Sequence, residues 1–81
     1  MRKADKNRII TIAEVYIKET RKRRIYGVTS KELKENTELD DIDNINTYHI
    51  GKALAASMKF AYELKHSRRY KQELNHWKLK E

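Results

Sequence analysis

The chain has 81 residues and no cysteine, so it can form one small domain held by packing or by a partner chain, without disulfides or thiolate zinc sites. Nineteen Lys and Arg against twelve Asp and Glu give a formal charge of +7, which favours polyanionic partners such as nucleic acid or anionic lipid headgroups. The apolar residues never form the run of about 18 that spans a bilayer, and no secretion signal is present, which predicts a cytoplasmic protein without membrane contact.

The charge is unevenly distributed along the chain. Residues 1–31 carry ten basic and three acidic groups, residues 32–45 carry one and six, and residues 46–81 carry eight and three. Two basic regions therefore flank one acidic stretch. We expect the basic regions to face a polyanion and the acidic stretch to keep its flank away from phosphates.

A first amphipathic helix is predicted from Asp5 to about Thr20, with residues 1–4 frayed. Its broad apolar face consists of Ile9, Ile10, Ile12, Ala13, Val15, Tyr16 and Ile17. The basic cluster at 21–24, which includes Arg23 and Arg24, follows directly. These cations suit the negative end of the helix dipole, and the alternatives are phosphate contact or a nuclear import signal.

A short β-prone segment and a second helix come next. Residues 25–28 can pair with the edge of a later hairpin. Thr29 and Glu32 have the S/T-x-x-E spacing of a capping box, in which the Thr hydroxyl accepts the amide of Glu32 and the Glu32 carboxylate accepts the amide of Thr29. A helix is therefore predicted to begin at Ser30, with Leu33 facing inward, and to end by about Thr37.

Residues 38–46 form an acidic connection, longer than that of a compact helix-turn-helix and with room for a short additional turn. A third helix is predicted from Asn46 or Thr47 to about Ser57. Its inward residues are Ile50, Ala53, Leu54 and Ser57, and its outward residues are Tyr48, His49, Lys52, Ala55 and Ala56.

The hydrophobic period changes from helical to alternating near Met58. Met58, Phe60, Tyr62 and Leu64 alternate with mostly polar residues, and Trp77 and Leu79 repeat the alternation, with Trp77 predicted to face the core. This predicts a hairpin with strands at 58–65 and 74–80, and with residues 80–81 frayed. Because the tip at 66–73 lacks glycine and proline, we expect it to be long and loose. A competing interpretation makes 47–75 one long helix of an all-α bundle.

The order of these elements, with Gly27-Val28-Thr29-Ser30-Lys31-Glu32-Leu33 at the second helix and Trp77-Lys78-Leu79 in the closing strand, resembles winged helix-turn-helix domains. The resemblance covers nearly the whole chain. Small single-domain regulators of archaeal viruses and plasmids are similar in size and charge. The resemblance implies an α+β fold over residues 1–81, with three helices, a short strand and a C-terminal β-hairpin wing.

The resemblance also implies binding of double-stranded DNA by a transcription regulator, with the helix over 47–57 in the major groove and the wing on the backbone. Carried over, the candidate base readers are Tyr48, His49 and Lys52. The candidate backbone contacts are Ser30, Lys31, Thr47, Arg68, Arg69, Lys71, Arg23 and Arg24. A solvated helix face and charges that protect strand edges are the alternative interpretations of the outward helix face and the basic tip. Such regulators often act as twofold dimers, for which the helix over 5–20 is the expected interface.

Other chemistry is not indicated. The spacings of the three histidines match no common zinc signature, and no catalytic arrangement or glycine-rich phosphate loop is present. We therefore expect no enzymatic activity, no metal, no cofactor and no small-molecule ligand. A module that binds another protein through the acidic segment 38–43 is the alternative function.

Overall fold

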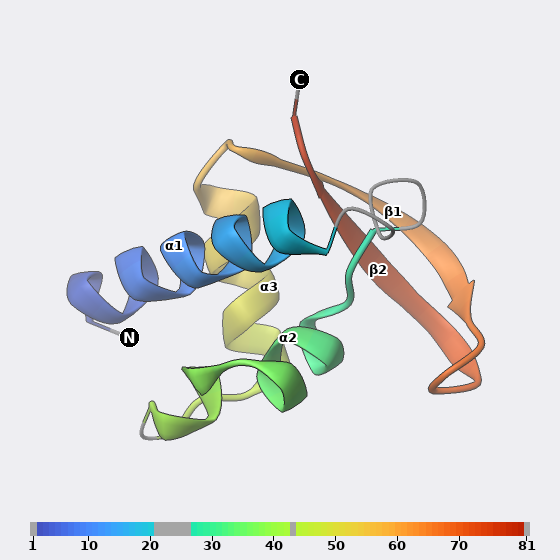
Figure 1. The fold of residues 1–81 in the computed structure, drawn as a ribbon, viewed down its shortest axis with the longest axis horizontal. Helices are drawn as coiled ribbons and strands as arrows, with labels where there is room; N and C mark the ends of the chain where they lie inside the picture. The colour runs from blue at the N-terminus through green and yellow to red at the C-terminus, as the bar shows by residue number, and fades with distance from the viewer. Residues whose placement is uncertain (1, 21–26, 43, 81) are drawn as a thin grey trace.

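Helices α1, α2 and α3 pack together against a C-terminal β hairpin in the computed structural model, which describes residues 2–20, 27–42 and 44–80 (Figure 1). The elements are α1 (Lys3–Glu19), α2 (Ser30–Asn36), the 3-10 helix η2 (Glu38–Asp41), α3 (Thr47–Ala56), β1 (Phe60–Ser67) and β2 (Gln72–Leu79). The described residues thus have an α+β fold. The competing prediction of one long helix over 47–75 is wrong, because α3 ends at Ala56 and β1 begins at Phe60.

The apolar face of α1 is buried in the core of the chain. Ile9, Ala13 and Ile17 are buried at successive helical turns, whereas Val15 stays 48% exposed. The helix begins at Lys3, within the segment expected to fray, and Thr20 closes it by donating its hydroxyl to the Tyr16 carbonyl at 2.7 Å. The basic cluster after it lies outside the described residues.

The predicted start of α2 is confirmed. Thr29 Oγ1 accepts the backbone N–H of Glu32 at 3.1 Å, the first half of a capping box. Just before it, Val28 and Trp77 exchange two backbone hydrogen bonds, at 2.9 and 2.7 Å. The predicted pairing of this segment with the hairpin is therefore confirmed at Val28, while residues 25 and 26 lie outside the described residues.

The acidic connection contains a short additional turn, the 3-10 helix η2, as its length allows. Leu39, Ile42 and Ile45 are buried, so η2 is anchored by its apolar residues and its carboxylates face outward. Thr37 starts this turn, with its Oγ1 accepting the N–H of Leu39 at 3.3 Å. Asp43 lies outside the described residues.

Helix α3 begins at Thr47, as predicted, because Asn46 Oδ1 accepts the N–H of His49 at 2.9 Å. Ile50, Ala53 and Leu54 are buried, which confirms the inward face. The helix stops where Met58 adopts a φ of 64°, and the chain then enters β1.

The predicted hairpin tip is wrong. The strands pair from Phe60↔Leu79 to Ser67↔Gln72, so the tip comprises only residues 68–71. Lys71 supplies the positive φ, 54°, and its N–H donates to the Ser67 carbonyl at 2.7 Å. Ser67 Oγ also accepts the N–H of Tyr70 at 3.2 Å. These bonds offset the cost, about 1–2 kcal/mol, of a left-handed non-glycine residue.

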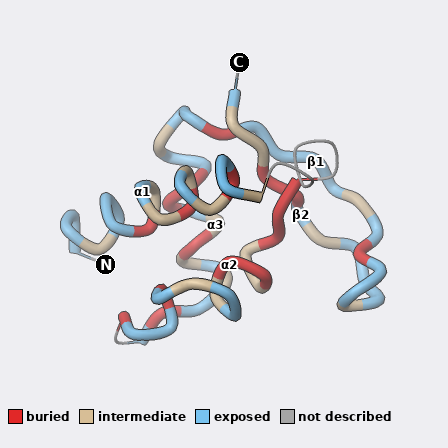
Figure 2. Tube along the Cα trace, in the orientation of Figure 1, coloured by how far each residue is buried: buried red, intermediate tan, exposed pale blue. Residues whose placement is uncertain are grey.

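The two ends of the hairpin have different surroundings. Near α3, Phe60 and Trp77 are 3% exposed, so Trp77 belongs to the core as predicted. Toward the tip most residues are exposed, and the end of the hairpin extends beyond the helices (Figure 2). The face that carries Tyr62 and Leu64 is therefore only partly covered.

Candidate nucleic-acid interface

A groove of about 440 Å³ lies between α3, the start of α2 and one face of the hairpin. Its cationic residues are Lys31 and Lys52, and its hydroxyl groups come from Thr29, Ser30, Thr47, Tyr48 and Tyr62. None of the described residues that line it carries a carboxylate. A hollow with two ammonium groups, several hydroxyls and no acidic side chain suits an anionic partner.

The outward face of α3 forms one wall of this groove. Tyr48 and Lys52 are one helical turn apart, and the Lys52 ammonium lies 5.9 Å from the centre of the Tyr48 ring. Tyr48 is 69% exposed. Gly51 lies beside them: a Cβ there would stand only 3.5 Å from Ser30 Oγ and 3.6 Å from the Trp77 ring. At position 51, α3 therefore lies close to both α2 and the hairpin, with room for no more than a small side chain.

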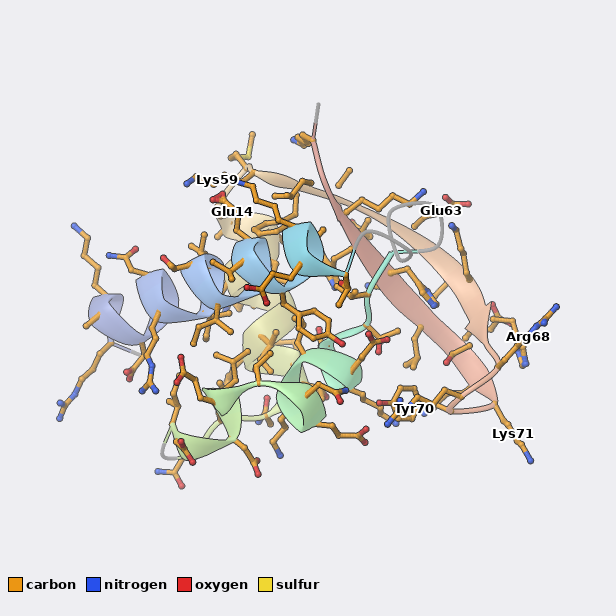
Figure 3. The ribbon with its side chains drawn as sticks, in the orientation of Figure 1. Glu14, Lys59, Glu63, Arg68, Tyr70 and Lys71 are labelled. Atoms are coloured by element: carbon orange, nitrogen blue, oxygen red, sulfur yellow. The ribbon has the colours of Figure 1, made fainter. Side chains whose placement is uncertain are left out.

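The hairpin tip is bound to α2 by a cluster that we call the tip clamp, comprising Glu35, Arg69 and Tyr70. Tyr70 Oη donates to Glu35 Oε2 at 2.8 Å, and Arg69 Nη2 donates to the same oxygen at 3.1 Å. Figure 3 shows Tyr70 turned toward α2, whereas Arg68 and Lys71 point away from the body. The Lys31 ammonium lies 5.4 Å from the Tyr70 ring centre, so the clamp lies beside one of the cations of the groove.

The clamp shifts the pKa values of two of its members. Burial raises the pKa of Tyr70 above its ordinary value, and the hydrogen bond to the Glu35 carboxylate raises it further. The pKa of Arg69 is raised by the charges of Tyr70 and Glu35. Arg69 is thus engaged within the chain, although its side chain is 54% exposed.

The structure brings some of the predicted contact residues together and separates others. Ser30, Lys31, Thr47, Tyr48 and Lys52 all line the groove. The His49 ring lies 6.1 Å from that of Tyr48, but His49 does not line the groove. Arg23 and Arg24 lie outside the described residues.

Arg68 and Arg69 border a second cavity, of about 790 Å³, between the hairpin and α2. Its Lys65, Ser67 and His76 alternate along the strands with Tyr62, Asn75 and Trp77 of the groove, so the two hollows lie mainly on opposite faces of the hairpin. The exceptions are His66, which lines the second cavity, and Leu74, which lines the groove. The second cavity also contains the buried carboxylate of Glu32, whose Oε2 accepts the Tyr16 hydroxyl at 2.8 Å. Both signs of charge line this cavity, which makes it less suited to phosphate than the groove.

Sequence reasoning missed three contributors to this region. Tyr62 and Asn75 share a hairpin face, so the strand alternation could have identified them once the register was known. The pairing of Glu35 with the tip spans about half the chain, and no local pattern signals it.

The remaining predicted surfaces stay predictions. Most apolar residues of α1 pack into the core of their own chain, so little of the expected dimer interface beyond Val15 is exposed. The acidic side chains of η2 face solvent, with Asp40 3.8 Å from the Lys34 ammonium. Among the residues that the structure describes, no helix is long and apolar enough to cross a membrane, and no three potential metal ligands cluster.

The sequence matches no model of a known family, no curated protein and no solved structure. The fold and the chemistry of the groove are therefore the basis for assigning a function. Over the described residues, the chain belongs to the α+β class, with α1, α2 and α3 followed by an antiparallel hairpin.

Proposed function

We propose that this chain is a winged-helix protein that binds double-stranded DNA in a sequence-specific manner and acts as a transcription regulator, without enzymatic activity. In this proposal α3 enters the major groove and the hairpin is the wing that contacts the backbone. The observation that carries it is the groove along α3, which is lined by Lys31 and Lys52 and by no described acidic residue.

The groove has the donors that a duplex requires. Phosphates accept hydrogen bonds from ammonium and hydroxyl groups, which Lys31, Ser30 and Thr47 offer. Tyr48 and Lys52 project from α3 and can reach base edges. Gly51 and Ala55 also line the groove, so no bulky side chain at these two positions blocks the approach of a duplex.

The topology supports the same proposal. Winged-helix domains place a short strand between their first and second helices and pair it with the closing strand of the wing. The backbone hydrogen bonds between Val28 and Trp77 match that arrangement. The tip clamp would hold the wing at a fixed angle to α2.

Titration of a labelled random duplex at several salt concentrations tests the proposal. The logarithm of the binding constant should fall linearly with the logarithm of the salt concentration, and Lys52→Ala should reduce the slope by about one unit. Lys6→Ala removes the same charge from exposed α1 and is the matched control, with an unchanged or nearly unchanged slope. Salt-independent binding, or no binding to any duplex, would exclude the proposal.

Selection from random duplexes tests the specificity. If the selection recovers a consensus site and Tyr48 reads a base edge, Tyr48→Ala should weaken the binding free energy by about 1–3 kcal/mol, and the loss should be confined to one base pair. A uniform loss across all sequences would instead identify Tyr48 as a backbone contact.

A further inference from the structure

Strand β1 has one edge that no other described strand covers. In the hairpin, β1 pairs only with β2, and β2 pairs on its other side with Val28. The N–H and C=O of Trp77 are both bonded to Val28, so Trp77 makes no ladder bonds with Tyr62 opposite it. At the alternate positions the strands do bond to each other: one step before β1, the Lys59 C=O accepts the N–H of Lys80 at 3.0 Å.

These bonds fix which backbone groups of β1 face outward. Alternate residues of an antiparallel strand bond to opposite neighbours. Phe60, Tyr62, Leu64 and His66 therefore direct their N–H and C=O groups toward the open edge. Tyr62 and Leu64 are also 60% and 64% exposed, which is unusual for large apolar side chains on an edge strand.

We propose that β1 pairs antiparallel with β1 of a second copy of this chain, about a twofold axis at Leu64, joining the two hairpins into one four-stranded sheet. The occupant of this edge is thus the protein itself. The proposal does not rest on DNA binding, and it differs from a dimer through α1, whose apolar residues already serve their own core.

Among the registers centred on residues 62–65, which pair most of β1 with its copy, charge selects the one centred on Leu64. In an antiparallel pair, residues whose N–H and C=O groups face the partner strand lie opposite one another, and so do residues whose groups face away. The twofold axis must therefore pass through a residue of β1 and not between two residues. An axis at Glu63 or Lys65 would place that residue opposite its own copy, and like charges directly opposite are destabilising. An axis at Tyr62 would bring Lys65 opposite the partner's Lys59.

An axis at Leu64 places Glu63 opposite the partner's Lys65 and, by symmetry, Lys65 opposite the partner's Glu63. Within one copy the Lys65 ammonium already lies 3.6 Å from Glu63 Oε2, so the pairing would join two ion pairs into a network of four charges. On the other face of the sheet, Leu64 meets its own copy and Tyr62 meets the partner's His66. Figure 3 shows where Glu63 lies on β1.

Charge reversal on β1, followed by sedimentation in the absence of DNA, tests the proposal. The wild type should form dimers in a concentration-dependent manner. Glu63→Lys and Lys65→Glu should each weaken self-association at least about tenfold, because like charges then oppose one another. An equimolar mixture of the two variants should form heterodimers, and the double reversal E63K/K65E should restore homodimers.

The controls separate this edge from general effects of charge and from α1. Glu38→Lys and Lys6→Glu make the same charge changes on exposed η2 and α1, and they should leave the dimer unchanged. Val15→Glu should also leave it unchanged. A wild type that stays monomeric at millimolar concentration, a mixture that forms no heterodimer, or a dimer abolished by Val15→Glu would overturn the proposal. Urea unfolding of each variant verifies that it is folded.

Discussion

At the scale of single residues, Gly27 has the most constrained backbone position among the described glycines. Its φ is +80°, and a Cβ there would lie 3.0 Å from the Trp77 carbonyl oxygen, which is backbone and cannot rotate away. Gly27→Ala should therefore lower the free energy of unfolding by at least about 1–2 kcal/mol. Urea unfolding monitored by Trp77 fluorescence measures the loss.

Gly51→Ala is the matched control for this prediction. Gly51 lies within α3, and a Cβ there meets its nearest neighbours at 3.5 Å and 3.6 Å, an ordinary contact distance. Replacement of glycine inside a helix gains up to about 1 kcal/mol. The two variants should thus shift stability in opposite directions, and equal losses would contradict the strained backbone at Gly27.

Thr29 is the second residue whose role can be isolated. It is 4% exposed, and its hydroxyl caps α2. Thr29→Ala should cost about 1 kcal/mol of unfolding free energy, because the Glu32 amide loses its acceptor, whereas Thr29→Ser should retain most of the stability. Equal destabilisation by both substitutions would show that packing of the Thr methyl group matters more than the cap.

At the scale of elements, the tip clamp should make stability depend on alkaline pH. The folded pKa of Tyr70 is raised above the value of about 10 expected in the unfolded chain. The clamp therefore contributes fully below pH 10, and its contribution is lost as pH rises through the folded pKa of Tyr70. Urea unfolding on both sides of pH 10 should show a smaller alkaline loss in Tyr70→Phe than in the wild type.

Glu35→Gln provides an independent test of the same clamp. It removes the negative charge that holds the Tyr70 phenol protonated and that pairs with Arg69. Ultraviolet titration should show the raised Tyr70 pKa moving back toward its ordinary value, with Tyr70→Phe identifying the signal. An unchanged Tyr70 titration would mean that burial alone, the largest cause of the shift, accounts for it.

The elements predicted correctly from the sequence are those defined by local chemistry. Thr29 and Glu32 locate the start of α2, and the change of period at Met58 marks the passage from α3 to the hairpin. The hairpin tip was mispredicted because the residue pattern shows neither the local conformation nor the long-range contact that decides it. Lys71 tolerates a positive φ, and Glu35 binds Arg69 and Tyr70 from the other half of the chain.

At the scale of the whole molecule, the sequence does not show where the basic groups lie relative to one another. The groove residues 30, 31, 47, 48 and 52 come from two helices, and their convergence follows from packing of α2 on α3. The sequence predicts Arg68 as a DNA contact together with these residues, but in the structure Arg68 borders the second cavity. A list of basic residues therefore does not define one surface.

This separation leads to a test of how a duplex would lie on the molecule. If the proposed DNA contacts both α3 and the end of the wing, Lys52→Ala and Arg68→Ala should each reduce the salt slope by about one unit, and the double variant by about two. Additivity is expected because the two residues line different hollows and share no described contact. A full effect of Lys52→Ala with none of Arg68→Ala would instead confine the duplex to the groove along α3. The wing would then serve as its side wall, contributing Tyr62 and Asn75 rather than its basic tip.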